Sequence, residues 1–278
     1  MITEEKLTII FNGRYEDETK SNIFTVKKIL PKSEIILSTY KVSKKDNKFF
    51  KKYNIKLIIN NDIGDYKEFP DNPKNLLRMM STFYNGLQVA KNSKILRLRT
   101  DYSLKPSFKN CLKKIRFKRF NLKYKNQSKI IENIYTTNIG FFYYENFHFS
   151  DQVIIGSKAM LKKIYFINKQ KFLKESDFSK LPKINGKWGS RLSSEQIIWI
   201  NFLKNLFNVE DAYLIYKNLA LHKKIYQEIQ ILDNNFFIIP PRLYNIRIKL
   251  RNYVMNNNNY LAYLLKKIYF FKNKKKKN

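Results

Sequence analysis

Three predicted strands of this sequence, residues 7–11, 34–39 and 93–100, end in polar residues. If these segments are parallel strands, their carboxyl ends lie at one edge of a sheet, where loops and helix N-termini converge and ligands bind. A carboxylate at that edge could hold a divalent cation against a diphosphate, because magnesium needs only one or two carboxylates when phosphates supply its other ligands. The residues in question are Asn12-Gly13, Ser38-Thr39 and Thr100-Asp101.

The segment that ends in Asp101 is unusual because it places Arg97 and Arg99 on one face. A strand covered on both faces is expected to be apolar throughout. Two buried guanidinium groups therefore need acids, phosphate or water as partners. The alternating pattern indicates either an edge strand with one face in water or a charged wall that ends in a carboxylate.

The elements that must position these residues alternate between strand and helix. Apolar residues recur at helical spacing after Asp71-Asn72-Pro73, which supplies a cap and a proline suited to the first helical position. Such alternation is typical of β-α-β units and a mainly parallel sheet flanked by helices, an α/β fold. The expected strands are 7–11, 34–39, 55–59, 93–100, two within 141–156, and 231–239; the expected helices are 21–30, 73–90, 157–171 and one that opens at 193, while 109–125 has no clear assignment.

The charge of the chain is extreme, with 55 Lys and Arg against 22 Asp and Glu among 278 residues, a net charge of +33. This charge favours anionic partners such as nucleic acid, phosphorylated ligands or a membrane surface. The alternative explanation of the charge is codon bias, because an AT-rich genome would produce the same abundance of Lys, Asn, Ile, Tyr and Phe.

Cys111 is the only cysteine, which excludes a disulfide framework or a thiolate zinc site and suits a reducing cytoplasm.

The ends of the sequence suggest a protein that does not span a membrane. The first residues lack the pattern of a signal peptide, and no run of 18 apolar residues is present. We expect residues 1–240 to form the main domain and residues 241–278 a basic helical tail. In that tail, the aromatic segment 260–271 precedes a lysine cluster. This arrangement suits either a helix on an anionic membrane surface or a last helix packed on the domain.

Several short blocks of the sequence resemble the WavE-type lipopolysaccharide-synthesis proteins. The resemblance extends over roughly residues 7 to 200, with the blocks in order and at similar spacing, and the tail beyond about residue 240 lies outside it. The blocks are Ser38-Thr39-Tyr40, Asn75-Leu76-Leu77-Arg78, Gly86-Leu87, Leu98-Arg99-Thr100-Asp101, Phe147-His148-Phe149-Ser150-Asp151 and Ile155-Gly156.

The resemblance implies a GT-A-like glycosyltransferase fold, a nucleotide-sugar donor and a divalent cation, manganese or magnesium. Asp101 matches the acidic metal-binding motif of such enzymes, although Asp101-Tyr102-Ser103 stands where Asp-x-Asp is usual. His222 could complete the coordination, as a late histidine does in several GT-A enzymes. The alternative is a histidine with a structural role on a helix.

Transfer of a sugar with inversion needs a base that takes the proton of the acceptor hydroxyl. Glu195 fits the position at which GT-A enzymes place a carboxylate at a helix start, although the helix dipole alone would also favour an acid there. Asp151 is the second candidate, as base or acceptor-sugar ligand, or else as part of a turn with Ser150. The nucleotide-sugar candidates are Asn12, Gly13, Thr39, Asn75, Arg78 and Arg99.

The sequence therefore predicts a bacterial glycosyltransferase that adds a sugar to a growing surface glycan such as lipopolysaccharide, lipooligosaccharide or capsule. The acceptor would be lipid-linked or an oligosaccharide. The enzyme would be cytoplasmic and peripheral at the inner face of the membrane, held there by its basic tail. Two alternatives remain, a basic nucleic-acid-binding protein and a non-catalytic GT-A-like module that binds glycans. Without a helix-turn-helix, zinc-finger or RNP-like pattern, nucleic acid is the less favoured partner.

Overall fold

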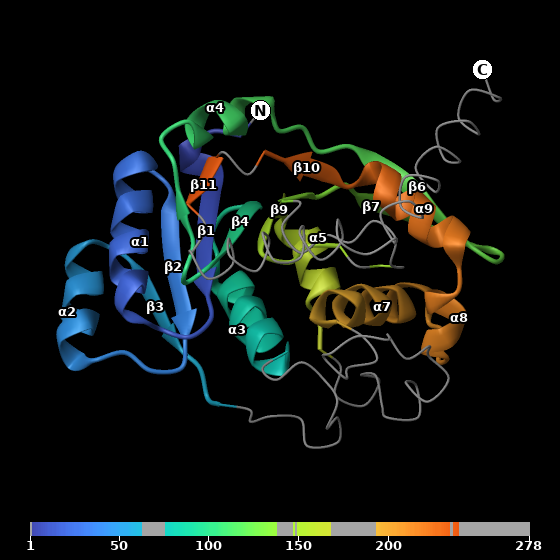
Figure 1. Ribbon diagram of the computed structural model, residues 1–278, viewed down its shortest axis with the longest axis horizontal. Coiled ribbons are helices and arrows are strands. Elements are labelled where there is room, and N and C mark those ends of the chain that lie inside the picture. Colours follow the sequence, from blue (N-terminus) through green and yellow to red (C-terminus); the bar gives the residue numbers. More distant parts are fainter. Residues whose placement is uncertain are drawn as a thin grey trace, which may run out of the picture. The chain divides into compact units, whose positions relative to one another are not determined.

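The computed structural model describes residues 2–62, 76–137, 147, 149–167, 193–233 and 236–238. These residues belong to the first of two units into which the chain divides, residues 1–238 and 239–278. Strands and helices alternate through its first hundred residues (Figure 1). The elements there are the 3₁₀ helix η1 (Glu4–Lys6), β1 (Leu7–Asn12), α1 (Asp17–Ile29), β2 (Glu34–Thr39), α2 (Lys44–Lys52), β3 (Lys56–Ile59), α3 (Leu76–Val89) and β4 (Lys94–Arg99).

The second half of this unit extends the sheet and adds two small sheets. Its strands are β5 (Ser103–Leu104), β6 (Arg119–Tyr124), β7 (Gln127–Glu132), β8 (Tyr135–Thr137), β9 (Val153–Ser157), β10 (Gln230–Leu232) and β11 (Phe237–Ile238). Its helices are α4 (Phe108–Lys114), α5 (Lys158–Ile164), α7 (Ser194–Phe207), α8 (Ala212–Tyr216) and α9 (Leu219–Glu228).

The main sheet has seven strands in the order β10-β8-β9-β4-β1-β2-β3. Strand β9 pairs antiparallel with β4 and with β8, and the other pairings in this sheet are parallel. The start of β9 therefore lies at the same edge as the carboxyl ends of β1, β2 and β4. Figure 1 shows α3, α5 and α7 on one side of the sheet, and α1 and α2 on the other.

Helix α3 is packed closely against the centre of the sheet. Its buried face includes Met80, Phe83 and Leu87. A Cβ atom at Gly86 would lie 2.7 Å from Cγ2 of Ile10, so the absence of a side chain lets the helix approach β1. These residues join the hydrophobic core that also contains the buried faces of α5 and α7.

The expected α/β class, with a mainly parallel sheet flanked by helices, is confirmed. Helix α1 begins four residues earlier than expected, because Glu16 caps it in a reciprocal pair with Thr19. The helix expected to open at 193 does so, with Ser193 and Gln196 forming a capping box. Helix α2, which the sequence reasoning did not predict, is capped by Ser43.

Other expectations need correction. The helix expected over 157–171 ends at Ile164, and the strand expected over 231–239 is two short strands, β10 and β11, in different sheets. Segment 109–125 contains α4 and β6. The edge-strand hypothesis for residues 93–100 is wrong, because β4 has β1 on one side and β9 on the other. The cap expected at 71–73, residues 141–146 and the tail 241–278 lie outside the described residues.

Candidate functional site

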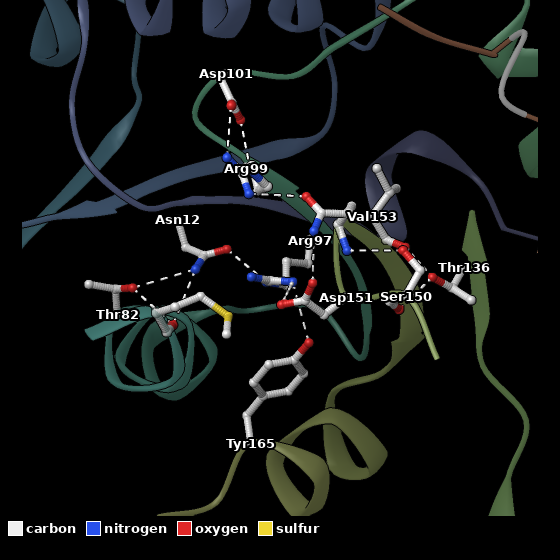
Figure 2. A network of polar contacts seen from close by, with 12 residues as sticks. Asn12, Thr82, Arg97, Arg99, Asp101, Thr136, Ser150, Asp151, Val153 and Tyr165 are labelled. Atoms are coloured by element: carbon white, nitrogen blue, oxygen red, sulfur yellow. Dashed lines mark hydrogen bonds and ion pairs between the residues drawn. The ribbon is translucent and has the colours of Figure 1, made fainter. Parts of the chain in front are cut away.

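The middle of β4 carries a charged side chain into the interior of the protein. The Arg97 side chain is only 1% exposed. Its Nε donates to Oδ1 of Asn12 at 2.8 Å, and its Nη1 lies 3.6 Å from Oδ2 of Asp151 and 3.4 Å from the hydroxyl of Tyr165. Figure 2 shows Arg97 between these three side chains. The buried guanidinium therefore has an acid, an amide and a phenol as partners, as its burial requires.

Two aromatic rings complete the surroundings of Arg97. The rings of Phe83 and Tyr165 each lie with their centroids 5.3 Å from the guanidinium carbon. Burial raises the pKa of Tyr165 to about 12, so this phenol is neutral at physiological pH. Cation–π contact and the charge of Asp151 together stabilise the arginine in the core.

The partner of Arg97, Asp151, belongs to a pair of carboxyl groups. Asp151 precedes β9, in a turn where the hydroxyl of Thr136 lies 2.8 Å from the carbonyl oxygen of Ser150. Glu195 occupies the first turn of α7. Burial, followed by the charge of Asp151 and a hydrogen bond between the two carboxyl groups, raises the pKa of Glu195 to about 8. The pair therefore retains a proton near neutral pH.

A second charged group lies at the end of β4. Arg99 donates from Nε to Oδ1 of Asp101 and from Nη2 to Oδ2, both at 2.9 Å, and from Nη1 to Oε1 of Gln152 at 3.1 Å. In turn, Nε2 of Gln152 donates to Oδ1 of Asp151 at 3.1 Å. The two arginines are thus linked through Asp151 and Gln152 into one network at the edge of the sheet (Figure 2).

The model of the WavE lipopolysaccharide synthesis family matches residues 12–276. The chain belongs to this family. The match continues through the segment beyond residue 240, which the resemblance seen in the sequence did not include. No curated protein matches this WavE-family chain.

Solved structures similar to the WavE-family chain include two glycosyltransferases. GlyE of Streptococcus pneumoniae is 12% identical, with 82% of this chain and 46% of GlyE covered and a TM-score of 0.40. The galactosyltransferase LgtC, solved with donor and acceptor sugar analogues, is 15% identical, with 82% and 74% covered and a TM-score of 0.39. A cytidylyltransferase of Leptospira borgpetersenii is 13% identical, with 59% and 65% covered and a TM-score of 0.35. The chain thus spans less than half the length of GlyE.

The predicted metal position of this WavE-family chain does not fit a bound cation. Both oxygens of Asp101 accept hydrogen bonds from Arg99, so a guanidinium occupies the side of the carboxylate that a metal would need. Within the described part of the chain, no group of three or more His, Cys, Asp and Glu side chains is placed to hold a metal ion. We therefore derive no chemical step through a metal.

The second predicted metal ligand, His222, lies in an aromatic cluster. Its ring is stacked on that of Phe149 at 5.3 Å, and its Nδ1 accepts a hydrogen bond from the backbone N–H of Phe147 at 3.0 Å. Burial, followed by the charge of Lys223, lowers the pKa of His222 to about 4. The imidazole is therefore neutral with its proton on Nε2, which is the arrangement of a structural histidine rather than of a ligand paired with Asp101.

Several predicted nucleotide-sugar residues lie at the edge of the sheet. Asn12 is buried and holds Arg97 while its Nδ2 donates to the carbonyl oxygen of Met79 at 3.2 Å. Gly13 has φ +133°, and a Cβ atom there would lie 3.2 Å from Oγ1 of Thr100. The hydroxyl of Thr39 is buried and, within the described ranges, has no hydrogen-bond partner.

Arg78 lies in the first turn of α3 and is paired with an acid. Its Nε and Nη2 donate to the two carboxylate oxygens of Asp62, at 2.6 and 3.0 Å. Its carbonyl oxygen accepts from the hydroxyl of Tyr40 at 2.8 Å. Asn75, predicted to act with Arg78, lies outside the described residues.

Sequence reasoning missed two members of the network. Gln152 links Arg99 to Asp151, and Tyr165 faces Arg97 from the end of α5. Gln152 directly follows the predicted Asp151, so its position in the sequence could have identified it as a candidate site residue. Tyr165 is one of 19 tyrosines in an aromatic-rich chain, and nothing in its spacing distinguishes it.

Proposed function

We propose that this WavE-family chain is a GT-A-like glycosyltransferase that moves a sugar from a nucleotide-sugar donor to a growing surface glycan. The family to which the chain belongs is one of lipopolysaccharide synthesis. The observation that carries the proposal is the polar network at the ligand-binding edge of a mainly parallel sheet. It joins a pair of carboxyl groups to arginine side chains, and these are the groups that such a transfer needs.

The carboxyl pair would handle the acceptor proton. The acceptor hydroxyl attacks the anomeric carbon while the bond to the diphosphate breaks, and a carboxylate takes the hydroxyl proton. Because the pKa of Glu195 is raised to about 8, the pair retains one proton near neutral pH, and the remaining carboxylate is available as base. We therefore propose Asp151 and Glu195 as one acid–base unit.

The donor would lie along the ends of the parallel strands. Arg99, whose side chain is partly exposed, would bind the diphosphate and stabilise the charge that develops as it departs. Thr39, with its buried hydroxyl, would meet the nucleoside. The other residues proposed to line this region are Asn12, Gly13, Asn75 and Arg78.

A thermal-shift panel of UDP-, GDP-, CMP- and dTDP-sugars, with and without manganese, tests the proposal. We expect one nucleotide class to raise Tm, and Asp151→Asn to retain this binding while transfer to an oligosaccharide acceptor falls about 100-fold or more, the usual size of a lost general base. Absence of stabilisation by all four classes would contradict the proposal. Donor binding without any transfer would support a non-catalytic, glycan-binding module instead.

We also propose that the basic tail brings the enzyme to the inner face of the membrane, where a lipid-linked acceptor would lie. The support is the sequence, in which the aromatic segment 260–271 precedes a cluster of lysines. No helix in the described ranges is long and apolar enough to cross a membrane. Removal of residues 257–278 should weaken sedimentation with anionic vesicles while donor binding is retained, and unchanged sedimentation would refute the role of the tail.

A further inference from the structure

The ion pair between Arg99 and Asp101 is asymmetric in its exposure. The Arg99 side chain is 34% exposed, whereas the Asp101 side chain is 2% exposed. The carboxylate therefore lies beneath the guanidinium, and the charged group that solvent meets at the end of β4 is a cation. A ligand that approaches this edge encounters positive charge before it can reach Asp101.

The guanidinium of Arg99 is held in place from two directions. It carries five N–H donors. Nε and Nη2 each donate one hydrogen bond to Asp101, and Nη1 donates one to Gln152. Among the described residues this leaves two donors of the guanidinium for a ligand. An arginine fixed in this way needs little reorganisation when it binds an anion, and its planar shape suits the oxygens of a phosphate group.

The other charged members of the network, Arg97 and Asp151, pair with each other, so the positive charge of Arg99 remains at the surface. The buried Arg97 is opposed by Asp151, and Gln152, which is neutral, connects Asp151 to Arg99.

A divalent cation bound to Asp101 would have to displace the guanidinium from both carboxylate oxygens. It would then lie beside a like charge in a partly buried site, where repulsion is poorly screened.

We infer that Arg99, held by Asp101 and Gln152, binds the diphosphate of the donor directly, with no divalent cation between Asp101 and the phosphates. This inference rests on the proposed function and makes it more specific. It changes the role of Asp101 from metal ligand to positioning residue. The arginine takes over the task of neutralising the leaving diphosphate.

Calorimetric titration of the full chain with inorganic pyrophosphate and with UDP, GDP, CDP and dTDP tests the inference. Each titration is carried out in EDTA and again with manganese in place of EDTA. We expect pyrophosphate and one nucleoside diphosphate to bind in EDTA. Manganese should change their Kd values by less than about threefold, well below the tenfold change that corresponds to about 1.4 kcal/mol. Binding that requires manganese would overturn the inference.

Two variants separate the guanidinium from the carboxylate. Arg99→Gln should weaken binding in EDTA about 10- to 100-fold, the usual effect of losing hydrogen bonds from a charged donor. Asp101→Asn keeps an oxygen that can accept from Arg99, so binding in EDTA should persist within about tenfold. Loss of binding in Asp101→Asn but not in Arg99→Gln would overturn the inference.

Arg119→Gln is the matched control. Arg119 is 78% exposed on β6, and its Nε lies 3.9 Å from Glu132, so the same charge is removed without touching the network. The control should bind as the wild type does, and thermal unfolding checks that each variant is folded. If Arg99→Gln fails to fold, the comparison of EDTA with manganese on the wild type still decides.

Failure of the inference and failure of the proposed function give different results. Binding of a nucleoside diphosphate with manganese and not in EDTA contradicts the inference alone and leaves a metal-assisted glycosyltransferase. Absence of binding to all the nucleotides in both conditions contradicts the glycosyltransferase proposal, and the inference with it. Equal loss of pyrophosphate binding in Arg119→Gln and Arg99→Gln would show only general attraction to a basic surface, which also overturns the inference.

Discussion

The surroundings of Arg97, in the middle of β4, and those of His222 are two buried regions, but the first stabilises a charged group and the second a neutral one. At β4, Arg97 keeps its charge in the core because Asp151 lies 3.6 Å away and Asn12 accepts from its Nε. At α9, His222 is stacked on Phe149 and stays neutral, with its pKa lowered to about 4 by burial and by the charge of Lys223. A buried group stays charged only where partners compensate for lost solvation.

This difference separates candidates that looked equivalent in the sequence. Asp101 and His222 were predicted to share a metal ion, yet one belongs to a charged network and the other to an aromatic cluster. We propose that the first region binds an anionic ligand. The second contributes packing and a hydrogen bond to the fold. Four substitutions test whether the two regions differ in this way.

Arg97→Met should have the largest effect. The substitution keeps an apolar stem but leaves Asp151 and Asn12 without their partner, and breaking a buried ion pair in this way typically costs about 3–5 kcal/mol. Urea denaturation measures the loss. A cost below about 1 kcal/mol would mean that Arg97 is not the residue that compensates Asp151, and the contrast with His222 would fail.

His222→Phe should have an intermediate effect at pH 7. Phenylalanine preserves stacking on Phe149 but removes the acceptor of the Phe147 N–H, which leaves a buried donor unpaired at a cost of about 1–3 kcal/mol. The folded pKa of His222, about 4, is below its model value of 6.5. Wild-type stability from the neutral ring is therefore lost as pH falls from about 6.5 towards 4.

The difference between wild type and His222→Phe should accordingly narrow over that acid range. Thermal unfolding at several pH values measures it. A gap that is constant from pH 7 to pH 4 would contradict a neutral, buried imidazole. Stabilisation of the wild type by manganese that is lost in the variant would restore the metal-ligand hypothesis.

Glu195→Gln should alter stability increasingly as pH rises from about 4.5 to 8. The folded pKa of Glu195, about 8, is above its model value of 4.5, so the folded state binds the proton more tightly than the unfolded chain. Wild-type stability therefore declines as pH rises from about 4.5 to 8, and the neutral amide avoids this decline. We expect a Tm about 2–4 °C above that of the wild type at pH 9, which corresponds to about 1 kcal/mol for a chain of this size.

Asp151→Asn serves as the comparison for that experiment. If the charge of Asp151 raises the pKa of Glu195, the decline in stability between about pH 4.5 and 8 should also be smaller in this variant. A decline over the same range that remains in Glu195→Gln would show that another group is responsible.

Arg119→Gln should have the smallest effect. This arginine is exposed and its ion pair is long, so its loss should change stability by no more than about 0.5 kcal/mol. Urea denaturation next to Arg97→Met makes the comparison between a surface arginine and a buried one. A similar cost for both would show that burial and partners do not distinguish them.

Local patterns in the amino-acid sequence were enough to indicate the α/β class, because strand and helix periodicity and caps involve residues close together in the chain. It located β1, β2 and β4 and the start of α7, where Ser193 and Gln196 form a recognisable capping box. It also placed Asn12, Thr39, Arg99 and Asp101 at one edge, since parallel strands share a direction. The blocks shared with the WavE family indicated the family.

Which charged side chains meet depends on the three-dimensional fold. The pairing of β9 with β4 brings Asp151 to Arg97 across a separation of 54 residues, and α7 then brings Glu195 to Asp151. No spacing in the sequence announces such contacts, because they depend on strand order and on where a helix packs. The same holds for Asp101 and His222, whose residue types suggested a shared metal site. The charged Arg99 beside Asp101 and the aromatic rings around His222 give the two residues different roles.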